Sequence, residues 1–133
     1  MSAWYLDSSA IVKFAVEEAE SEAIASWRAG LEFDDVVMTC ELSIVEVLRA
    51  VRRVDGAEEI ALTHLDALDH LVMDRDLLLA AGRLDPTKLR TLDAIHLAAA
   101  MAAGDELAGV VTYDARMADA ARQLGLTTLA PTP

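Results

Sequence analysis

Short apolar runs alternate with longer amphipathic stretches along this chain, and this alternation limits its fold more than any other feature. Runs typical of buried strands occupy residues 3–6, 36–38, 109–113 and 127–130. The stretches between them predict helices over residues 8–20, 20–31, 39–54, 57–72, 76–84, 91–103 and 114–124. Parallel neighbouring strands need crossover connections, which are usually helices. The sequence therefore predicts an α/β fold, with a single three-layer α/β/α domain over residues 1–133 and a small, mainly parallel central sheet flanked by helices.

The composition predicts a protein outside the membrane that contacts other subunits. Hydrophobic residues make up 54% of the 133 residues, yet no run reaches the roughly 18 apolar residues of a membrane span. This apolar surplus predicts a subunit interface, in the simplest case a homodimer. Trp4 and Tyr5 follow the first residue almost directly, without a basic and apolar leader, so we expect a cytoplasmic protein. The single cysteine, Cys40, is expected to be a small buried apolar residue.

The net charge of −12 argues against a general affinity for nucleic acid, because phosphate backbones are normally met by clustered lysine and arginine. Two local groups of cations stand out, which are Arg49, Arg52 and Arg53 in LRAVRR, and Lys88 and Arg90 in TKLR. From the sequence alone we interpret both groups as ordinary solvated surface. The acidic total fits a basic partner protein equally well, because complementary potentials steer association.

Two aspartates follow directly after predicted strands. Asp7 ends the strand in YLDSSA, and Asp114 follows the strand GVVTY. Taken singly, each is expected to cap the first turn of the next helix, which is a common role of aspartate. If their strands are parallel, both carboxylates also emerge at the same edge of the sheet, where ligands bind in such folds. Capping does not explain that coincidence.

A third carboxylate, Asp93, lies in TLDAIHLAAAMAA, a predicted helix that is apolar on nearly all sides. A buried carboxylate needs a partner, and backbone amides at the helix start or a metal ion would serve about equally well. We interpret His96 on the same helix as a hydrogen-bonded structural side chain, because no other His or Cys stands at metal-ligand spacing. His64 and His70 are expected on the surface of another helix.

The fourth carboxylate, Glu46, is the weakest candidate by periodicity. The apolar stripe of its predicted helix lies on the opposite side and runs through Ile44, Val47, Leu48, Val51 and Val54. Arg49, three residues further on, would be a suitable ion-pair partner. Periodicity alone therefore predicts a solvated glutamate.

Four phrases of the sequence carry a family likeness, namely YLDSSA, LSIVEVLRAVRR, LRTLDAIHLAAA and VVTYDARMADAARQLGLTTLAP. On these phrases, nearly the whole chain resembles the PIN-domain ribonucleases, and in particular the VapC-type toxins of bacterial toxin–antitoxin pairs. The resemblance implies a PIN-like fold and a metal-dependent endoribonuclease that cuts structured RNA, such as tRNA or rRNA, by attack of water on a phosphodiester. It also implies a 5′ phosphate on the product, a homodimer, and a VapB-type antitoxin that forms a higher complex with the toxin.

The same resemblance implies roles for individual residues. Asp7, Glu46, Asp93 and Asp114 would form the catalytic acidic site and bind Mg²⁺ or Mn²⁺, which are hard cations that prefer oxygen ligands. Ser9 and Thr112 would be hydroxyl neighbours that orient a ligand or water. The candidate RNA contacts are Arg49, Arg53, Lys88, Arg90 and Arg116. Cys40 departs from the family pattern, since many relatives have a serine there.

Two other functions stay open at this point. A phospho-acceptor receiver domain also binds Mg²⁺ through aspartates at strand ends, but such domains have two adjacent acids after the first strand and a lysine after a late one. Here Asp7 stands alone, and no lysine follows Leu89. The second is a PIN fold without catalysis that serves only as a binding module for RNA or protein. The presence of all four acids argues against it.

Overall fold

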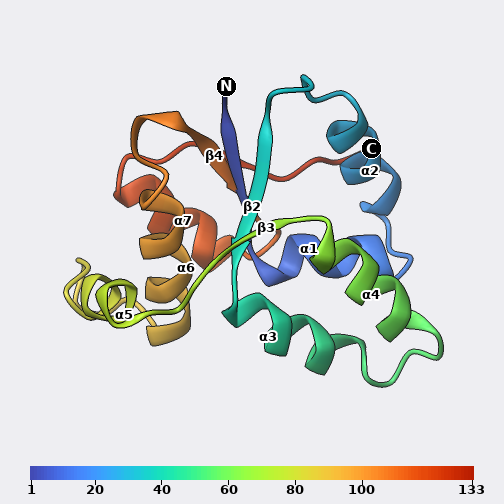
Figure 1. The fold of residues 1–133 in the computed structure, drawn as a ribbon, viewed down its shortest axis with the longest axis horizontal. Coiled ribbons are helices and arrows are strands. Elements are labelled where there is room, and N and C mark those ends of the chain that lie inside the picture. Colours follow the sequence, from blue (N-terminus) through green and yellow to red (C-terminus); the bar gives the residue numbers. More distant parts are fainter.

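A five-stranded sheet forms the centre of the computed structural model, which describes residues 1–133 (Figure 1). The strands are β1 (Ala3–Leu6), β2 (Val36–Cys40), β3 (Asp69–Leu71), β4 (Leu107–Val111) and β5 (Thr128–Leu129). They lie in the order β3-β2-β1-β4-β5, and every neighbouring pair is parallel. The predicted small sheet is confirmed, and it is parallel throughout.

Helices cover both faces of this sheet. They are α1 (Ser8–Ala15), α2 (Ser21–Ala29), α3 (Leu42–Val51), α4 (Ala57–Asp66), α5 (Arg75–Gly82), α6 (Thr91–Met101) and α7 (Ala115–Gln123), with a short 3₁₀ helix over Gly104–Glu106. Helices α1 to α4 lie on one side of the sheet and α5 to α7 on the other (Figure 1). The predicted three-layer α/β/α architecture is therefore confirmed. None of these helices combines the length and the apolar character that a membrane crossing requires.

The side chains of the strands alternate between two hydrophobic cores, as the period of two in a strand requires. Ala3 and Tyr5 of β1 join a core cluster of 17 buried residues with α5, α6 and α7. Leu6 joins a second cluster, of 11 buried residues, with α1, α3 and α4. Helix α6 is buried without a break from Ala94 to Ala100, because it packs against both the sheet and α5. Its nearly all-round apolar sequence follows from this position.

The neighbouring strands β1 and β4 mark the point where the chain changes direction across the sheet. After β1 the chain adds β2 and β3 on one side, and then crosses to β4 and β5 on the other. Leu6 pairs with Val111 at the carboxyl ends of β1 and β4. In open α/β sheets, ligands bind outside the strand ends at such a switch point. Asp7 and Thr112, which follow the two strands, therefore lie where a site is expected.

Residues 57–72 do not form the single helix that the sequence predicted. Helix α4 ends at Asp66, and Asp69–Leu71 form β3, an edge strand paired with β2. The hydrophobic pattern wrongly indicated a continuous helix because Leu65 and Leu68, three residues apart, are both buried. A strand of three residues is also too short to show alternation.

His64 lies on helix α4 as expected, but the helical position expected for His70 is wrong, and neither side chain is fully exposed. His70 lies in β3, and its Nε2 donates a hydrogen bond to the carbonyl oxygen of Leu65 (2.7 Å). His64 is half-buried, and its ring stacks on Phe14 with 5.0 Å between the ring centroids. Both imidazoles therefore have structural contacts.

Three element boundaries also differ from the sequence prediction. The first predicted helix stops at Ala15, and β4 starts at Leu107. Thr39 was expected before a helix, but it lies inside β2, where its Oγ1 donates to the carbonyl oxygen of Leu6 (2.8 Å).

Candidate active site

Asp7 is a buried carboxylate, with only 3% of its surface exposed. Its Oδ1 caps α1 by accepting hydrogen bonds from the amide of Ala10 (3.1 Å) and from Ser9 Oγ (2.6 Å). Its Oδ2 accepts a short hydrogen bond from Thr112 Oγ1 (2.5 Å). Burial raises the pKa of Asp7, although the hydroxyl groups of Ser9 and Thr112 partly offset this effect. Asp7 is thus both a helix cap and a buried carboxyl group at the sheet edge.

Thr112 connects Asp7 with Asp114. Thr112 Oγ1 donates to Asp7 and accepts a hydrogen bond from the amide of Asp114 (3.0 Å). Ser9 Oγ accepts a hydrogen bond from the amide of Tyr113 (2.9 Å) while it donates to Asp7. The two hydroxyl groups therefore hold the Asp7 carboxylate between the ends of β1 and β4. Their predicted role of orienting a ligand or water stays a prediction.

Asp114 is the exposed member of the set and caps α7. Its Oδ1 accepts hydrogen bonds from the amides of Arg116 (2.9 Å) and Met117 (3.4 Å). Because β4 is parallel to β1, Asp114 emerges at the same edge as Asp7. Both the cap and the common edge that the sequence predicted are present.

Glu46 is held by hydrogen bonds from two other helices. Ser8 Oγ of α1 donates to Glu46 Oε1 (2.5 Å), and His96 Nε2 of α6 donates to the same oxygen (2.6 Å). Burial alone would raise the pKa of Glu46, but the hydrogen bonds from His96 and Ser8 outweigh it and lower the pKa. Both bonds reach Oε1, which leaves Oε2 available for a ligand.

The sequence interpretation of Glu46 as a solvated side chain is therefore wrong. Helix α3 buries Leu42, Ser43, Val47 and Val51. Ile44 and Val54, which belonged to the predicted stripe, are 39% and 43% exposed. The buried face is thus rotated toward Glu46, whose side chain is only 25% exposed. Glu46 pairs with His96 and not with Arg49.

His96 belongs to a buried chain of polar side chains that sequence reasoning found only in part. Its Nδ1 lies 2.7 Å from Tyr5 Oη, and the Tyr5 hydroxyl donates to Cys40 Sγ (3.2 Å). The chain links β1 and β2 to α6, and through His96 to Glu46 on α3. The expectations of a hydrogen-bonded structural histidine and a buried Cys40 are confirmed. A tyrosine within a buried strand was the available signal, because its hydroxyl needs a partner.

Asp93 lies in the first turn of α6, and its Oδ2 is buried without a hydrogen-bond partner. Burial raises the pKa of Asp93, and the nearby carboxylates of Asp114 and Glu46 raise it further. The sequence left two kinds of partner open, and no backbone amide fills that role for Oδ2. A buried carboxylate oxygen without a partner is costly when other acids lie within electrostatic reach, unless a cation neutralises it.

The structure brings the four carboxylates to one edge of the sheet. Thr112 joins Asp7 to Asp114, and Asp93 lies within electrostatic reach of both Asp114 and Glu46. As the side chains stand, no three His, Cys, Asp or Glu residues form a group that could hold a metal ion. The chemistry of the donors fits a hard cation, since all four are carboxylates and one buried oxygen lacks a partner.

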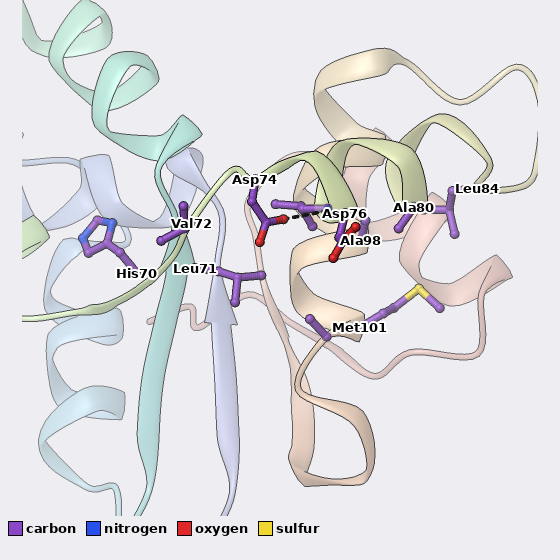
Figure 2. A pocket seen from close by; sticks show the side chains of 11 residues that line it. His70, Leu71, Val72, Asp74, Asp76, Ala80, Leu84, Ala98 and Met101 are labelled. Carbon is purple, nitrogen blue, oxygen red and sulfur yellow. Dashed lines mark hydrogen bonds between the residues drawn. The ribbon is translucent and has the colours of Figure 1, made fainter.

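An apolar cavity of 690 Å³ lies apart from these acids, between β3, α5 and α6 (Figure 2). Leu71, Leu84 and Met101 are among its lining residues. Asp74 also lines it, and caps α5 by accepting a hydrogen bond from the amide of Leu77 (2.9 Å). None of the four candidate carboxylates lines this cavity, so it is separate from the predicted metal site.

The charge state of His96 predicts a pH dependence of stability in metal-free buffer. Burial alone would lower the pKa of His96, but its contacts with Cys40 and Glu46 raise the pKa to about 10. The stabilisation is fully present below the ordinary value of about 6.5 and is lost as the pH rises toward the folded-state pKa. We expect the free energy of unfolding, measured with urea and EDTA, to fall over this range. His96→Gln keeps a donor for Glu46 without a proton to lose, so its profile should be flatter. Coinciding profiles would mean that His96 is neutral in the fold.

Comparisons with known proteins agree with this architecture. A family model described as the PIN domain matches residues 4–123. The chain is 46% identical to Ribonuclease VapC46 of Mycobacterium tuberculosis, over 98% of this chain and 99% of that protein. It is 37% identical to Ribonuclease VapC47 of the same species, over 96% of each. The crystal structure of M. tuberculosis VapC20, described as a Sarcin-Ricin loop cleaving toxin, matches with a TM-score of 0.72 at 17% identity, over 96% of this chain and 99% of that one. At that identity the structural likeness concerns the fold alone.

Proposed function

Since the chain belongs to the PIN-domain family, and within it to the VapC ribonucleases, we propose that it is a Mg²⁺- or Mn²⁺-dependent endoribonuclease toxin. The proposal rests on two observations: Asp7 and Asp114 follow neighbouring parallel strands at one edge of the sheet, and Asp93, whose buried Oδ2 has no hydrogen-bond partner, interacts electrostatically with Asp114 and Glu46. The family model matches residues 4–123, and this match sets aside the receiver-domain alternative.

The four carboxylates are the residues that would hold the metal. A bound Mg²⁺ or Mn²⁺ ion would polarise the phosphodiester and lower the pKa of an attacking water. Asp7 would be the central ligand, because Ser9 and Thr112 fix its orientation. Glu46 would use Oε2, since its Oε1 already accepts two hydrogen bonds. Asp93 would be the second central ligand, Asp114 would complete one metal site and Glu46 the other, and the product would carry a 5′ phosphate.

The proposed substrate is a structured RNA, such as tRNA or rRNA. VapC20, which shares this fold, is described as a Sarcin-Ricin loop cleaving toxin, and we take an RNA of this kind as the first substrate to test. Structured RNAs are read mainly by shape and at unpaired loops, so the choice of target would depend on the surface around the site. Arg49, Arg53, Lys88, Arg90 and Arg116 are the proposed RNA contacts.

The proposed partners are a VapB-type antitoxin and a second copy of the chain, which together would form a higher toxin–antitoxin complex in the cytoplasm. The net charge of −12 favours a basic partner. Large apolar side chains are also exposed, including Val45 (51%), Val72 (60%) and Leu92 (48%), and a partner subunit could cover them.

One observation favours a second candidate function. The carboxylates do not stand close enough together to form a ready ligand group. A PIN fold that binds RNA or protein without cutting would not need such a group. Like charges repel, so the catalytic proposal requires the cation itself to draw the side chains together.

Cleavage by purified, antitoxin-free protein decides between these two functions. The substrates would be defined structured RNAs, including tRNA and rRNA fragments, incubated with Mg²⁺, Mn²⁺ or EDTA. The nuclease proposal predicts internal cuts that leave 5′ phosphates and disappear in EDTA. A folded protein that binds these RNAs and cuts none of them with either metal would instead be a binding module.

A further inference from the structure

A polar cavity of 310 Å³ lies directly beside the candidate acidic site, between the start of α6, the loop before it, and α7. Its lining includes Lys88, Arg90, Asp93, Arg116 and Asp119. Three of these side chains are cationic, although the chain has 23 acidic residues against 11 lysines and arginines. A concentration of positive charge at this position is therefore contrary to the overall composition.

The three cations of this cavity have no protein partner for their charge. Lys88, Arg90 and Arg116 are exposed, and none of them takes part in an ion pair. Asp119, an acid on the same wall, is already paired with Arg122 (2.5 Å). The cavity therefore offers three free positive charges to an anion from outside.

The cavity also shares a wall with the acidic site. Asp93 lines it, and Arg90 lies close enough to favour the charged form of that carboxylate. Arg116 follows Asp114 by two residues at the start of α7. A second cationic cavity, of 520 Å³, is lined by Arg49, Ala50, Arg52 and Arg53, and none of the four carboxylates lines it. Only the first cavity joins free cations to a proposed metal ligand.

We propose that the cavity of Lys88, Arg90 and Arg116 binds a backbone phosphate of the RNA strand, next to the phosphodiester that is cut. This inference rests on the proposed function and specifies how its substrate is held. Arginine matches the geometry of a phosphate, and phosphate contacts fix the position of a nucleic acid strand without reading its sequence. The cavity would offset the repulsion between RNA and an acidic protein, and would place the strand across Asp93.

The test compares two double variants that lower the net charge equally. Lys88→Gln/Arg116→Gln removes two cations of the cavity and keeps Arg90, whose charge acts on the Asp93 carboxylate. Arg75→Gln/Arg83→Gln removes two exposed cations at the ends of α5, neither of which lines the cavity. Binding of a short labelled single-stranded RNA would be measured in EDTA over a salt titration, together with Mn²⁺ affinity and the kinetics of cleavage.

We expect the cavity variant to bind this RNA about tenfold more weakly, with a salt slope shallower by about 0.7 for the lost phosphate contact. Its KM for RNA should rise while kcat and Mn²⁺ affinity stay close to those of the wild type. The α5 variant should keep the wild-type slope. Equal slopes in the two variants would overturn the proposal. The proposal would also be overturned if the cavity variant lost affinity for polyglutamate but not for RNA. That result would identify an acidic peptide as the occupant of the cavity.

The outcomes also separate this proposal from the function on which it rests. If the wild type cuts no RNA but its binding depends on the cavity, the phosphate site stands and the nuclease assignment fails. If the wild type cuts RNA and both variants cut it alike, the nuclease assignment stands and the phosphate site fails.

Discussion

Replacing Asp7 with asparagine is expected to lower the rate of RNA cleavage by about a thousandfold, because a central metal ligand supplies several kcal/mol of transition-state stabilisation. The fold should persist. Asparagine keeps the Oδ1 atom that caps α1 through the amide of Ala10, and it removes an acidic group whose pKa is raised by burial. Initial cleavage rates and calorimetric titration with Mn²⁺ would measure the effect. Both activity and metal affinity should fall.

Asp66→Asn is the matched control for this variant. Asp66 is an exposed aspartate at the end of α4, away from the carboxyl edge of the sheet, so its replacement should change neither rate nor metal affinity. Circular dichroism would confirm that both proteins fold. A folded Asp7→Asn variant that cuts RNA at the wild-type rate would remove Asp7 from the site.

Replacing Asp93 with asparagine is expected to move stability and activity in opposite directions. In EDTA the variant should be more stable by at most about 1 kcal/mol, or roughly 4 °C in Tm, because asparagine lacks the acidic group that Asp114 and Glu46 disfavour; the partial exposure of Asp93 keeps the effect small. With saturating Mg²⁺ the wild type should become more stable than the variant, because metal binding stabilises only the chain that has the complete site. Cleavage should be lost, as for Asp7→Asn.

Thermal unfolding with and without Mg²⁺ would measure this reversal. Asp119→Asn provides the comparison, since Asp119 pairs with Arg122 at the surface and its loss should change stability little in either buffer. If Asp93→Asn lowers Tm in EDTA, the Asp93 carboxylate stabilises the fold without metal, and its role as an unsatisfied metal ligand is contradicted.

Much of the fold could be predicted from the sequence because its strands and helices differ clearly in pattern. The strand at 3–6 and the long apolar helix from Thr91 are examples, since β1 lies in the core and α6 is buried without a break from Ala94 to Ala100. The exception is β3, which has three residues and pairs on one edge only. Local periodicity cannot detect an element whose formation depends on the free edge of β2.

The candidate site was predicted in two unequal parts. Asp7 and Asp114 followed from strand direction, because parallel strands bring their carboxyl ends together. Glu46 came only from the family resemblance, since its position depends on how α3 rotates against the sheet. The chain of Tyr5, Cys40 and His96 that supports Glu46 joins residues far apart in the sequence, and no local pattern could reveal it.

The hydrogen bond between Glu46 and His96 joins helices that pack on opposite faces of the sheet. Helix α6 belongs to one hydrophobic core and much of α3 to the other, so this contact reaches around the sheet edge from one layer to the next. The spacing of the acids is therefore a measure of how the two layers are aligned. A displacement of about 1 Å can cost about a hundredfold in rate. A protein that binds one helix layer and shifts it against the other would therefore lower the rate of cleavage without contacting the acids.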